Sequence, residues 1–198
     1  LSLDLKNGYE HGILAACQNL GEIYWHRMEY IQAVFYFQKG LNICERINND
    51  LKYSEIIIPY FIVSLEMGEI ATAERLFFKL SDIKKKIENP IINQRFLLCK
   101  ALLLRRQDDI DSLNKAIYAL TVISKDKIRY FDTTVMAISY LCEFLLTKTL
   151  LTKNSKYIFE EVKDNIEKTT RDTVMEYLVN NKFKDFTVVT IGTKEINI

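Results

Sequence analysis

Apolar and small residues near the start of the chain recur at the spacing of an α-helix. Side chains at positions i, i+3, i+4 and i+7 share one helix face, which then packs against a neighbour. Two successive stripes have helical spacing: Cys17, Leu20, Gly21 and Tyr24, followed by Tyr30, Ala33, Phe37 and Gly40. The polar stretch "RMEY" at 27–30 lies between them and suits a tight turn. The pattern therefore predicts two amphipathic helices that pack against each other.

The same pattern returns along the chain at a step of about 40 residues, which we call the repeat step. The positions in phase are Tyr30, Ile70 and Ile110, then Ala33, Ala73 and Leu113, then Phe37, Phe77 and Ile117, then Gly40, Leu80 and Leu120. The stretches "EMGEI" and "RQDDI" take the place of the first turn, and Gly68 is the residue best able to adopt a positive φ there. A fixed period of this length is typical of a solenoid built from helix pairs.

The period also sets the expected boundaries. We expect units at about 14–53, 54–93, 94–130 and 131–180, a partial unit at 1–12 and a tail at 185–198, the repeats together forming one domain of residues 1–184. Leu1 and Leu3 are in phase with Leu41 and Ile43, so the partial unit is expected to end a preceding helix whose beginning has been cut. The tail is β-branched and weakly alternating, which leaves a short strand, a capping segment and a disordered end open.

Single residues add expectations about where helices begin. Pro59 and Pro90 are expected near helix starts, where a missing N–H costs least. Asp132 is expected to cap the first helix of the fourth unit, and the second helix of that unit is expected around 155–178. The first two units are expected to be joined by a link within "ICERINNDLKYS", residues 43–54.

The composition fits one domain without a strongly charged partner. The 198 residues are 48% apolar, which is enough to bury a sizeable core. Lys and Arg total 27 against 26 Asp and Glu, so the net charge of +1 gives no reason to expect nucleic acid or a membrane surface as partner. We see no signal peptide or membrane-spanning run, and we expect a soluble chain. The widely spaced Cys17, Cys44, Cys99 and Cys142 predict buried, reduced thiols and a cytoplasmic location.

No arrangement of residues indicates catalysis. His11 and His26 are the only histidines, and neither belongs to an H-E-x-x-H motif or a recognisable triad. The segment near Gly192 lacks the first glycine and the Gly-Lys-Thr order of a P-loop. We therefore expect no enzyme activity, no cofactor and no metal.

The first unit resembles the tetratricopeptide repeat family. In that family a small residue follows a Leu in the first helix, a Tyr lies three residues further on, and an Ala and an aromatic residue mark the second helix. Leu20, Gly21, Tyr24, Ala33 and Phe37 fit this pattern, and the length of the repeat step is similar to that of the long-repeat variety. The resemblance implies an all-α, right-handed superhelix of three to four helix pairs.

The resemblance also implies where partners bind, since the first helices of such pairs line a concave surface. The candidate partner-binding residues on that face are Gln18, Glu22, Trp25, Ile58, Ile62, Leu65, Arg95, Leu98, Leu102, Arg105 and Arg106. An apolar groove followed by Arg105 and Arg106 favours an apolar helix or peptide that carries an acidic group. The alternative is that Ile58, Leu65, Leu102 and Leu145 simply pack against a longer superhelix or against the chain's own C-terminal helix.

Two classes of function follow. The first is a protein-interaction module within a larger regulatory or scaffold protein, with self-association through the cut end as a further expectation. The second is a ligand- or peptide-sensing domain of a bacterial-type transcriptional regulator or signalling ATPase. In that case Trp25, Arg95, Arg105 and Arg106 would make the first contacts.

Overall fold

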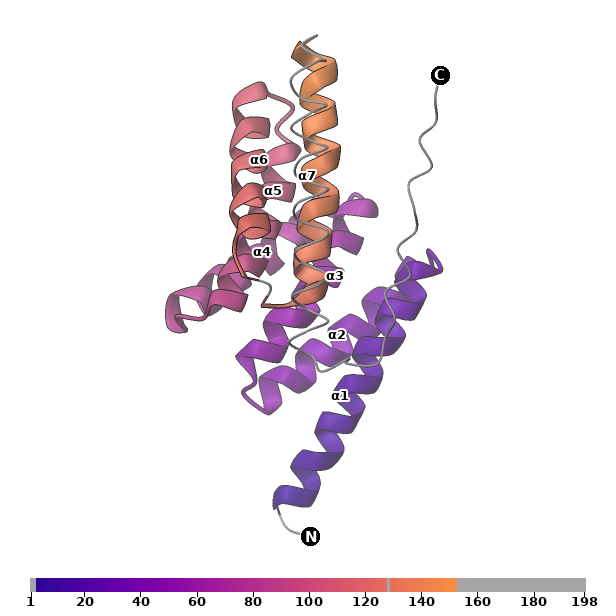
Figure 1. Cartoon of the computed structure of the whole chain (residues 1–198). Coiled ribbons are helices and arrows are strands. Elements are labelled where there is room, and N and C mark those ends of the chain that lie inside the picture. The colour runs from indigo at the N-terminus through magenta and orange to yellow at the C-terminus, as the bar shows by residue number, and fades with distance from the viewer. Residues whose placement is uncertain (1–2, 128, 153–198) are drawn as a thin grey trace, which may run out of the picture.

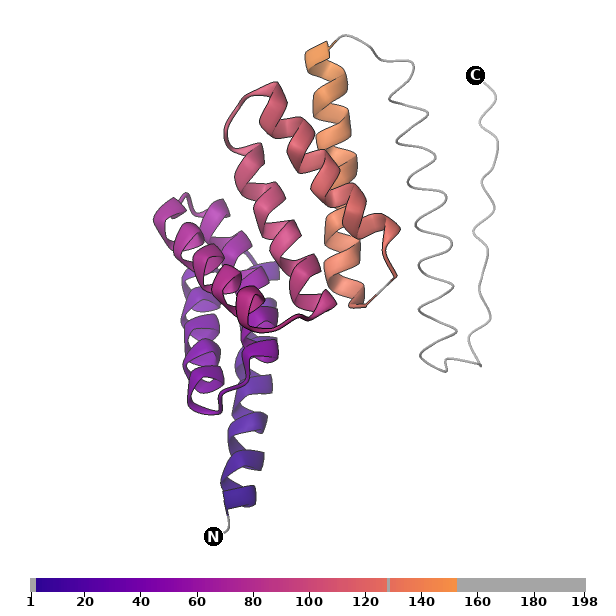
Figure 2. The same cartoon turned by 90° about the vertical axis from the view of Figure 1, so that its left-hand side faces the viewer.

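The computed structural model describes residues 3–127 and 129–152, and all the regular structure in this part of the chain is helical (Figure 1). The helices are α1 (Leu3–His26), α2 (Tyr30–Arg46), α3 (Asp50–Glu66), α4 (Ile70–Lys86), α5 (Pro90–Arg105), α6 (Ile110–Lys125) and α7 (Phe131–Thr152). Each helix packs against the next one in the chain, and Figure 2 shows α7 lying along the α5–α6 pair. The predicted all-α helical repeat fold is therefore confirmed.

The helices follow one another at half the repeat step. The second helices of the pairs, α2, α4 and α6, begin at Tyr30, Ile70 and Ile110, which confirms the predicted step. The helices between them, α3 and α5, begin midway, at Asp50 and Pro90. The apolar stripes showed the repeat step but not the regular spacing of 20 residues between helix starts. The two kinds of helix have different apolar patterns, because α3 buries much more of its surface than α2 does.

Three connections end their helices in the same way. Met28, Asn48 and Gly68 have positive φ values of 61°, 50° and 78°. After α1, the N–H of Glu29 donates to the carbonyl of Tyr24 at 2.9 Å, and the N–H of Met28 donates to the carbonyl of Trp25. Together with the positive φ, these two bonds form a Schellman motif. The equivalent longer bonds run from Asn49 to Cys44 and from Glu69 to Ser64. Gly68 was predicted to have this conformation, whereas Met28 and Asn48 were not.

The predicted unit boundaries lie several residues too late. α3 and α5 begin at residues 50 and 90 rather than at 54 and 94, because each helix is capped earlier than the stripes suggested. The Asn49 side chain accepts a hydrogen bond from the N–H of Lys52 at 3.0 Å, and the Asn89 side chain accepts one from Ile91 at 2.8 Å. The link expected within 43–54 is therefore confined to residues 47–49.

Other expectations about helix ends have mixed outcomes. Pro90 is the first residue of α5, as predicted, but Pro59 lies in the middle of α3, where its missing N–H leaves the carbonyl of Glu55 without its usual helical donor. Asp132 lies in the first turn of α7 and is not its cap. The partial unit at 1–12 is not a separate helix, since α1 is continuous from Leu3 to His26. The expected helix around 155–178 and the tail at 185–198 lie outside the described residues.

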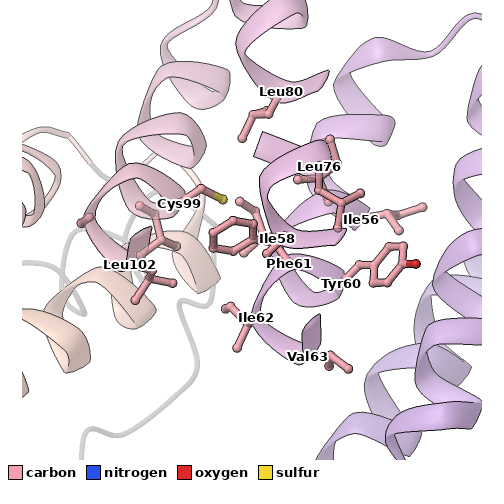
Figure 3. Packing of buried hydrophobic residues seen from close by; sticks show 14 of the residues in the cluster. Ile56, Ile58, Tyr60, Phe61, Ile62, Val63, Leu76, Leu80, Cys99 and Leu102 are labelled. Carbon is pink, nitrogen blue, oxygen red and sulfur yellow. The ribbon is translucent and has the colours of Figure 1, made fainter. Parts of the chain in front are cut away.

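Helix α3 lies at the centre of the packing (Figure 3). It contacts α1, α2, α4 and α5, and its apolar run "IIIPYFIV" is buried throughout. In Figure 3, Phe61 lies toward Cys99 and Leu102 of α5, whereas Tyr60 points to the opposite side, where it stacks on Phe37 of α2. The helix is therefore packed on several faces and presents little apolar surface to solvent.

Small residues allow α1 and α2 to approach closely. A Cβ atom added to Gly21 would lie 2.6 Å from Cδ1 of Phe37, whose side chain is fully buried. Ala33 is also fully buried, and Gly40 lies against Ile56 of α3 as well as Cys17 of α1. These positions confirm that the small residues of the stripes form the interfaces between helices.

Candidate functional site

A pocket of about 280 Å³ opens where the first helices of the pairs meet. Among these helices, α3 contacts α1 and α5, and α5 also contacts α7, so they share one side of the solenoid. We call this cavity the inner pocket. Its lining residues are Gln18, Glu22, Trp25, His26, Glu55, Ile58, Pro59, Arg95, Tyr130, Phe131, Asp132, Thr133, Val135 and Met136.

Arg95 of α5 forms the floor of the inner pocket, and its side chain is 1% exposed. Its Nη1 donates to the carbonyl of Leu51 at 3.1 Å and to Oγ of Ser54 at 2.7 Å, and its Nη2 lies 3.5 Å from Oε2 of Glu55. The guanidinium carbon lies 4.6 Å from the ring centroid of Tyr130. Burial lowers the pKa of Arg95, and the nearby Glu55 opposes this shift. The charge is thus paired within the fold.

Glu55 connects α3 with its neighbours on both sides. Its Oε1 accepts hydrogen bonds from Nε2 of Gln18 at 2.8 Å, from Nζ of Lys52 at 3.0 Å and from the hydroxyl of Tyr130 at 2.8 Å. Burial by itself would raise the pKa of Glu55, but these hydrogen bonds outweigh it and lower the pKa. Burial, followed by the bond to Glu55, raises the pKa of Tyr130, so this hydroxyl remains a donor at neutral pH. One carboxylate therefore ties together α1, α3 and the residue before α7.

Trp25 forms one wall of the inner pocket and is hydrogen-bonded to α3. Its Nε1–H donates to Oε2 of Glu66 in α3 at 3.0 Å, and its ring stacks on His26 with 5.2 Å between centroids. Trp25 is the only tryptophan of the chain, so any spectroscopic signal from an indole reports on this wall. On the α7 side, Val135 is 41% exposed and Met136 is half-buried. The pocket therefore combines a hydrogen-bonded aromatic wall with an accessible apolar one.

The structure gathers five of the predicted partner-binding residues at the inner pocket: Gln18, Glu22, Trp25, Ile58 and Arg95. Ile62, Leu98 and Leu102 do not lie on an open groove, because they are only 2%, 0% and 7% exposed. The contact between α3 and α5 covers the face that was expected to be free. Leu145, which the alternative also named, is likewise buried, at 2% exposed.

The remaining predicted residues lie away from the pocket. Leu65 is half-buried at the end of α3 and does not line the cavity. Arg105 lies over the ring of Phe144, with 5.8 Å between its guanidinium carbon and the ring centroid, and Arg106 is exposed at the end of α5. The arginine pair therefore does not set the charge of the inner pocket, and the expected acidic group of a partner loses its main support.

Sequence reasoning missed the residues that the start of α7 contributes, chiefly Tyr130, Phe131, Asp132 and Met136. The repeat step could have indicated one of the residues from this region. Val135 lies one repeat step after Arg95, which itself lies one repeat step after Glu55, and all three line the pocket. The repeat could have identified Val135, but Tyr130 precedes its helix and has no place in a helical stripe.

A second hollow, of about 420 Å³, lies between α5 and α6. We call it the outer groove, and its lining residues are Leu97, Lys100, Leu104, Asn114, Lys115, Tyr118, Ala119 and Val122. Tyr118 is 73% exposed and Val122 is 39% exposed. No hydrogen bond or ion pair between these lining side chains is seen, so its walls are less constrained than those of the inner pocket.

The comparisons with known proteins do not assign the chain to a family. No protein-family model matches the sequence, and no curated protein matches it significantly. None of the helices in residues 3–127 and 129–152 has both the length and the apolar character that a bilayer crossing requires. The same residues contain no group of three or more His, Cys, Asp or Glu side chains able to hold a metal ion. All four cysteines are free thiols, and three of them are buried.

Proposed function

We propose that the chain is a protein-interaction module that binds a segment of a partner protein in the inner pocket. The observation that carries the proposal is a preformed cavity lined by residues from α1, α3 and α5 and by the start of α7, with a hydrogen-bonded polar floor. Cavities with fixed apolar walls and a few placed polar groups are the usual form of a binding site. We further propose that the helix pairs are long tetratricopeptide-like repeats, on the basis of Leu20, Gly21, Tyr24, Ala33 and Phe37.

The electrostatics of the pocket support binding rather than catalysis. Glu55 has a lowered pKa and Tyr130 a raised one, so neither group exchanges its proton readily near neutral pH. Arg95 is paired and almost fully buried. We therefore propose a non-enzymatic role within a larger regulatory or scaffold protein, in a reducing cytoplasmic compartment that suits the free thiols. Self-association stays a prediction, which sedimentation velocity at high protein concentration tests.

A second candidate is the sensing of a small ligand or peptide by a regulator. The observation that favours it is the position of Glu55, which accepts hydrogen bonds from Gln18 of α1 and from Tyr130 at the start of α7. A ligand that displaced either bond would change how the first helices are held together. Sensing requires that the ligand alter helix packing, whereas simple docking does not. Hydrogen exchange in α3 and α5 with and without a bound peptide distinguishes the two.

The test compares two matched substitutions. Val135→Lys places a long side chain in the inner pocket, and Val122→Lys makes the same change at a valine of similar exposure in the outer groove. Peptides are selected from a random library displayed on phage against the unmodified chain, and each binder is then measured against both variants. We expect Val135→Lys to weaken binding at least tenfold and Val122→Lys to leave it unchanged. Binders whose affinity is unchanged by Val135→Lys would overturn the proposal, provided that circular dichroism shows both variants folded.

A further inference from the structure

The charges left without an ion-pair partner at the inner pocket are negative. Its lining residues include the carboxylates of Glu22, Glu55 and Asp132 and one guanidinium, that of Arg95. Arg95 and Glu55 pair with each other at the floor, and Lys52 also reaches Glu55. Among the described residues no Lys or Arg forms an ion pair with Glu22 or Asp132. Arg95 and Lys52 thus share one carboxylate at the floor, whereas Glu22 and Asp132 have no such ion pair in the described part of the chain. Three carboxylates against these two cations leave one net negative charge at the pocket.

These carboxylates have the exposure that a ligand needs. Glu22 is half-buried on α1 and accepts one hydrogen bond, from Nε2 of Gln18 at 3.1 Å. Asp132 is exposed in the first turn of α7. They belong to different helix pairs but line the same cavity, so a group that enters it can approach both carboxylates. The half-buried Glu22 attracts an opposite charge more strongly than a fully solvated carboxylate would.

The aromatic walls favour the same kind of ligand. Trp25, Tyr130 and Phe131 line the cavity, and the faces of such rings attract cations. The fold already contains one cation held by a ring and a carboxylate, since the guanidinium of Arg95 contacts both the ring of Tyr130 and the carboxylate of Glu55. The hydrogen bond from Trp25 to Glu66 orients the indole ring before a ligand arrives.

We propose that the inner pocket receives the basic side chain, Lys or Arg, of a partner segment. Glu22 and Asp132 pair with its charge, Trp25 lies beside it, and the aliphatic stem packs on Ile58, Val135 and Met136. This inference rests on the proposed function and defines the chemistry of the partner at that site. It replaces the acidic group that Arg105 and Arg106 suggested from sequence.

The experiment repeats the phage selection with variants of the full chain. One selection uses the unmodified chain, one uses Glu22→Gln with Asp132→Asn, and one uses Glu74→Gln with Asp111→Asn, which removes two exposed charges from α4 and α6. We expect peptides from the first and third selections to share an enriched Lys or Arg position and those from the second to lack it. A selected peptide should bind the double pocket variant about tenfold more weakly, and its affinity should fall as salt is raised.

Each outcome decides between the two proposals. Binders that depend on Val135 but show no basic position, or that bind the double pocket variant as tightly as the unmodified chain, would overturn this inference and leave the proposed function standing. Binders enriched in acidic or purely apolar residues would overturn it in the same way. If no binder depends on Val135, the proposed function fails, and this inference fails with it. Norleucine in place of the enriched residue provides the matched peptide control, and it should lose the salt dependence.

Discussion

The inner pocket and the outer groove differ in what holds their walls. The outer groove is the larger hollow, at about 420 Å³ against 280 Å³, but its residues come from one helix pair and include the highly exposed Tyr118. The inner pocket takes residues from four helices, and Glu55 and Arg95 link them through a buried polar network. The difference teaches that a candidate site is recognised by preorganised groups that converge from separate elements, and that volume is a poor guide.

The comparison has a physical basis in the repeat. The residues that line the outer groove come only from the two helices of one pair. The first helices of successive pairs, by contrast, meet along one side of the fold. A ligand in the inner pocket would therefore contact several units at once, while a ligand in the outer groove would contact one. If these contacts hold the inner pocket together, substitutions there should lower the free energy of unfolding more than substitutions in the outer groove.

The largest effect is expected at the floor of the inner pocket. Arg95→Met removes the guanidinium and leaves Glu55 buried with a weaker partner, so we expect a loss of about 3 kcal/mol in the free energy of unfolding. Arg106→Met is the control, because Arg106 is exposed, and it should change stability by less than about 0.5 kcal/mol. Urea unfolding monitored by circular dichroism measures both. Equal stability of the two variants would show that the network is not structurally important.

The α1 wall should be sensitive to an added methyl group. Gly21→Ala brings a Cβ into the buried ring of Phe37 and should cost about 1 to 3 kcal/mol. Gly12→Ala lies in the same helix with open space around it, and it should stabilise the chain by about 0.5 to 1 kcal/mol. Thermal unfolding of the two variants should therefore shift in opposite directions. A shift in the same direction would argue against the close contact between α1 and α2.

A smaller effect is expected from Tyr130→Phe, and it should depend on pH. Because the pKa of Glu55 is lowered in the folded state, its stabilising contribution is complete above the ordinary value of 4.5 and is lost as the pH falls through the folded value. Removing the Tyr130 hydroxyl should cost about 1 kcal/mol near neutral pH. It should also raise the pKa of Glu55, so acid unfolding begins at a higher pH. Tyr118→Phe, in the outer groove, should leave the pH profile unchanged; identical profiles for all three proteins would contradict the role given to Tyr130.

The smallest effects are expected in the outer groove. Tyr118→Ala and Val122→Ala remove side chains that are 73% and 39% exposed, so each should change the free energy of unfolding by less than about 0.5 kcal/mol. Denaturant unfolding compared with that of the parent measures this. A loss above about 1 kcal/mol for Tyr118→Ala would mean that the groove is more tightly packed than its exposure indicates, and the contrast with the inner pocket would weaken.

Much of the fold could be predicted from sequence because the signals were local and periodic. Helical spacing placed Gly21 and Ala33 on the packing faces of their helices. The step from Tyr30 to Ile70 predicted where the second helices begin. The helix starts were harder, since Asn49 and Asn89 cap their helices without standing out from other polar loop residues. The apolar run of α3 has no polar face, so periodicity alone could not show that it was packed on several sides.

The candidate site could be predicted only in part, for a different reason. Gln18, Glu22 and Trp25 lie far from Arg95 in the sequence, and only the stacking of first helices brings them together. They line one cavity with Arg95, whereas Ile62 and Leu102, which were expected on the same face, are buried where α3 contacts α5. Whether a residue beside the packing stripe is open or covered depends on the distance between neighbouring pairs, which sequence spacing does not contain.

The most direct test of the account is an NMR titration that follows the indole N–H of Trp25. As the only tryptophan, it gives a single side-chain signal from the wall of the inner pocket. We predict that a phage-selected peptide shifts this signal to saturation, that Val135→Lys abolishes the shift and that Val122→Lys preserves it. Saturable binding that leaves the Trp25 signal in place and instead shifts the backbone amides of Tyr118 and Val122 would contradict the account and identify the outer groove as the recognition surface.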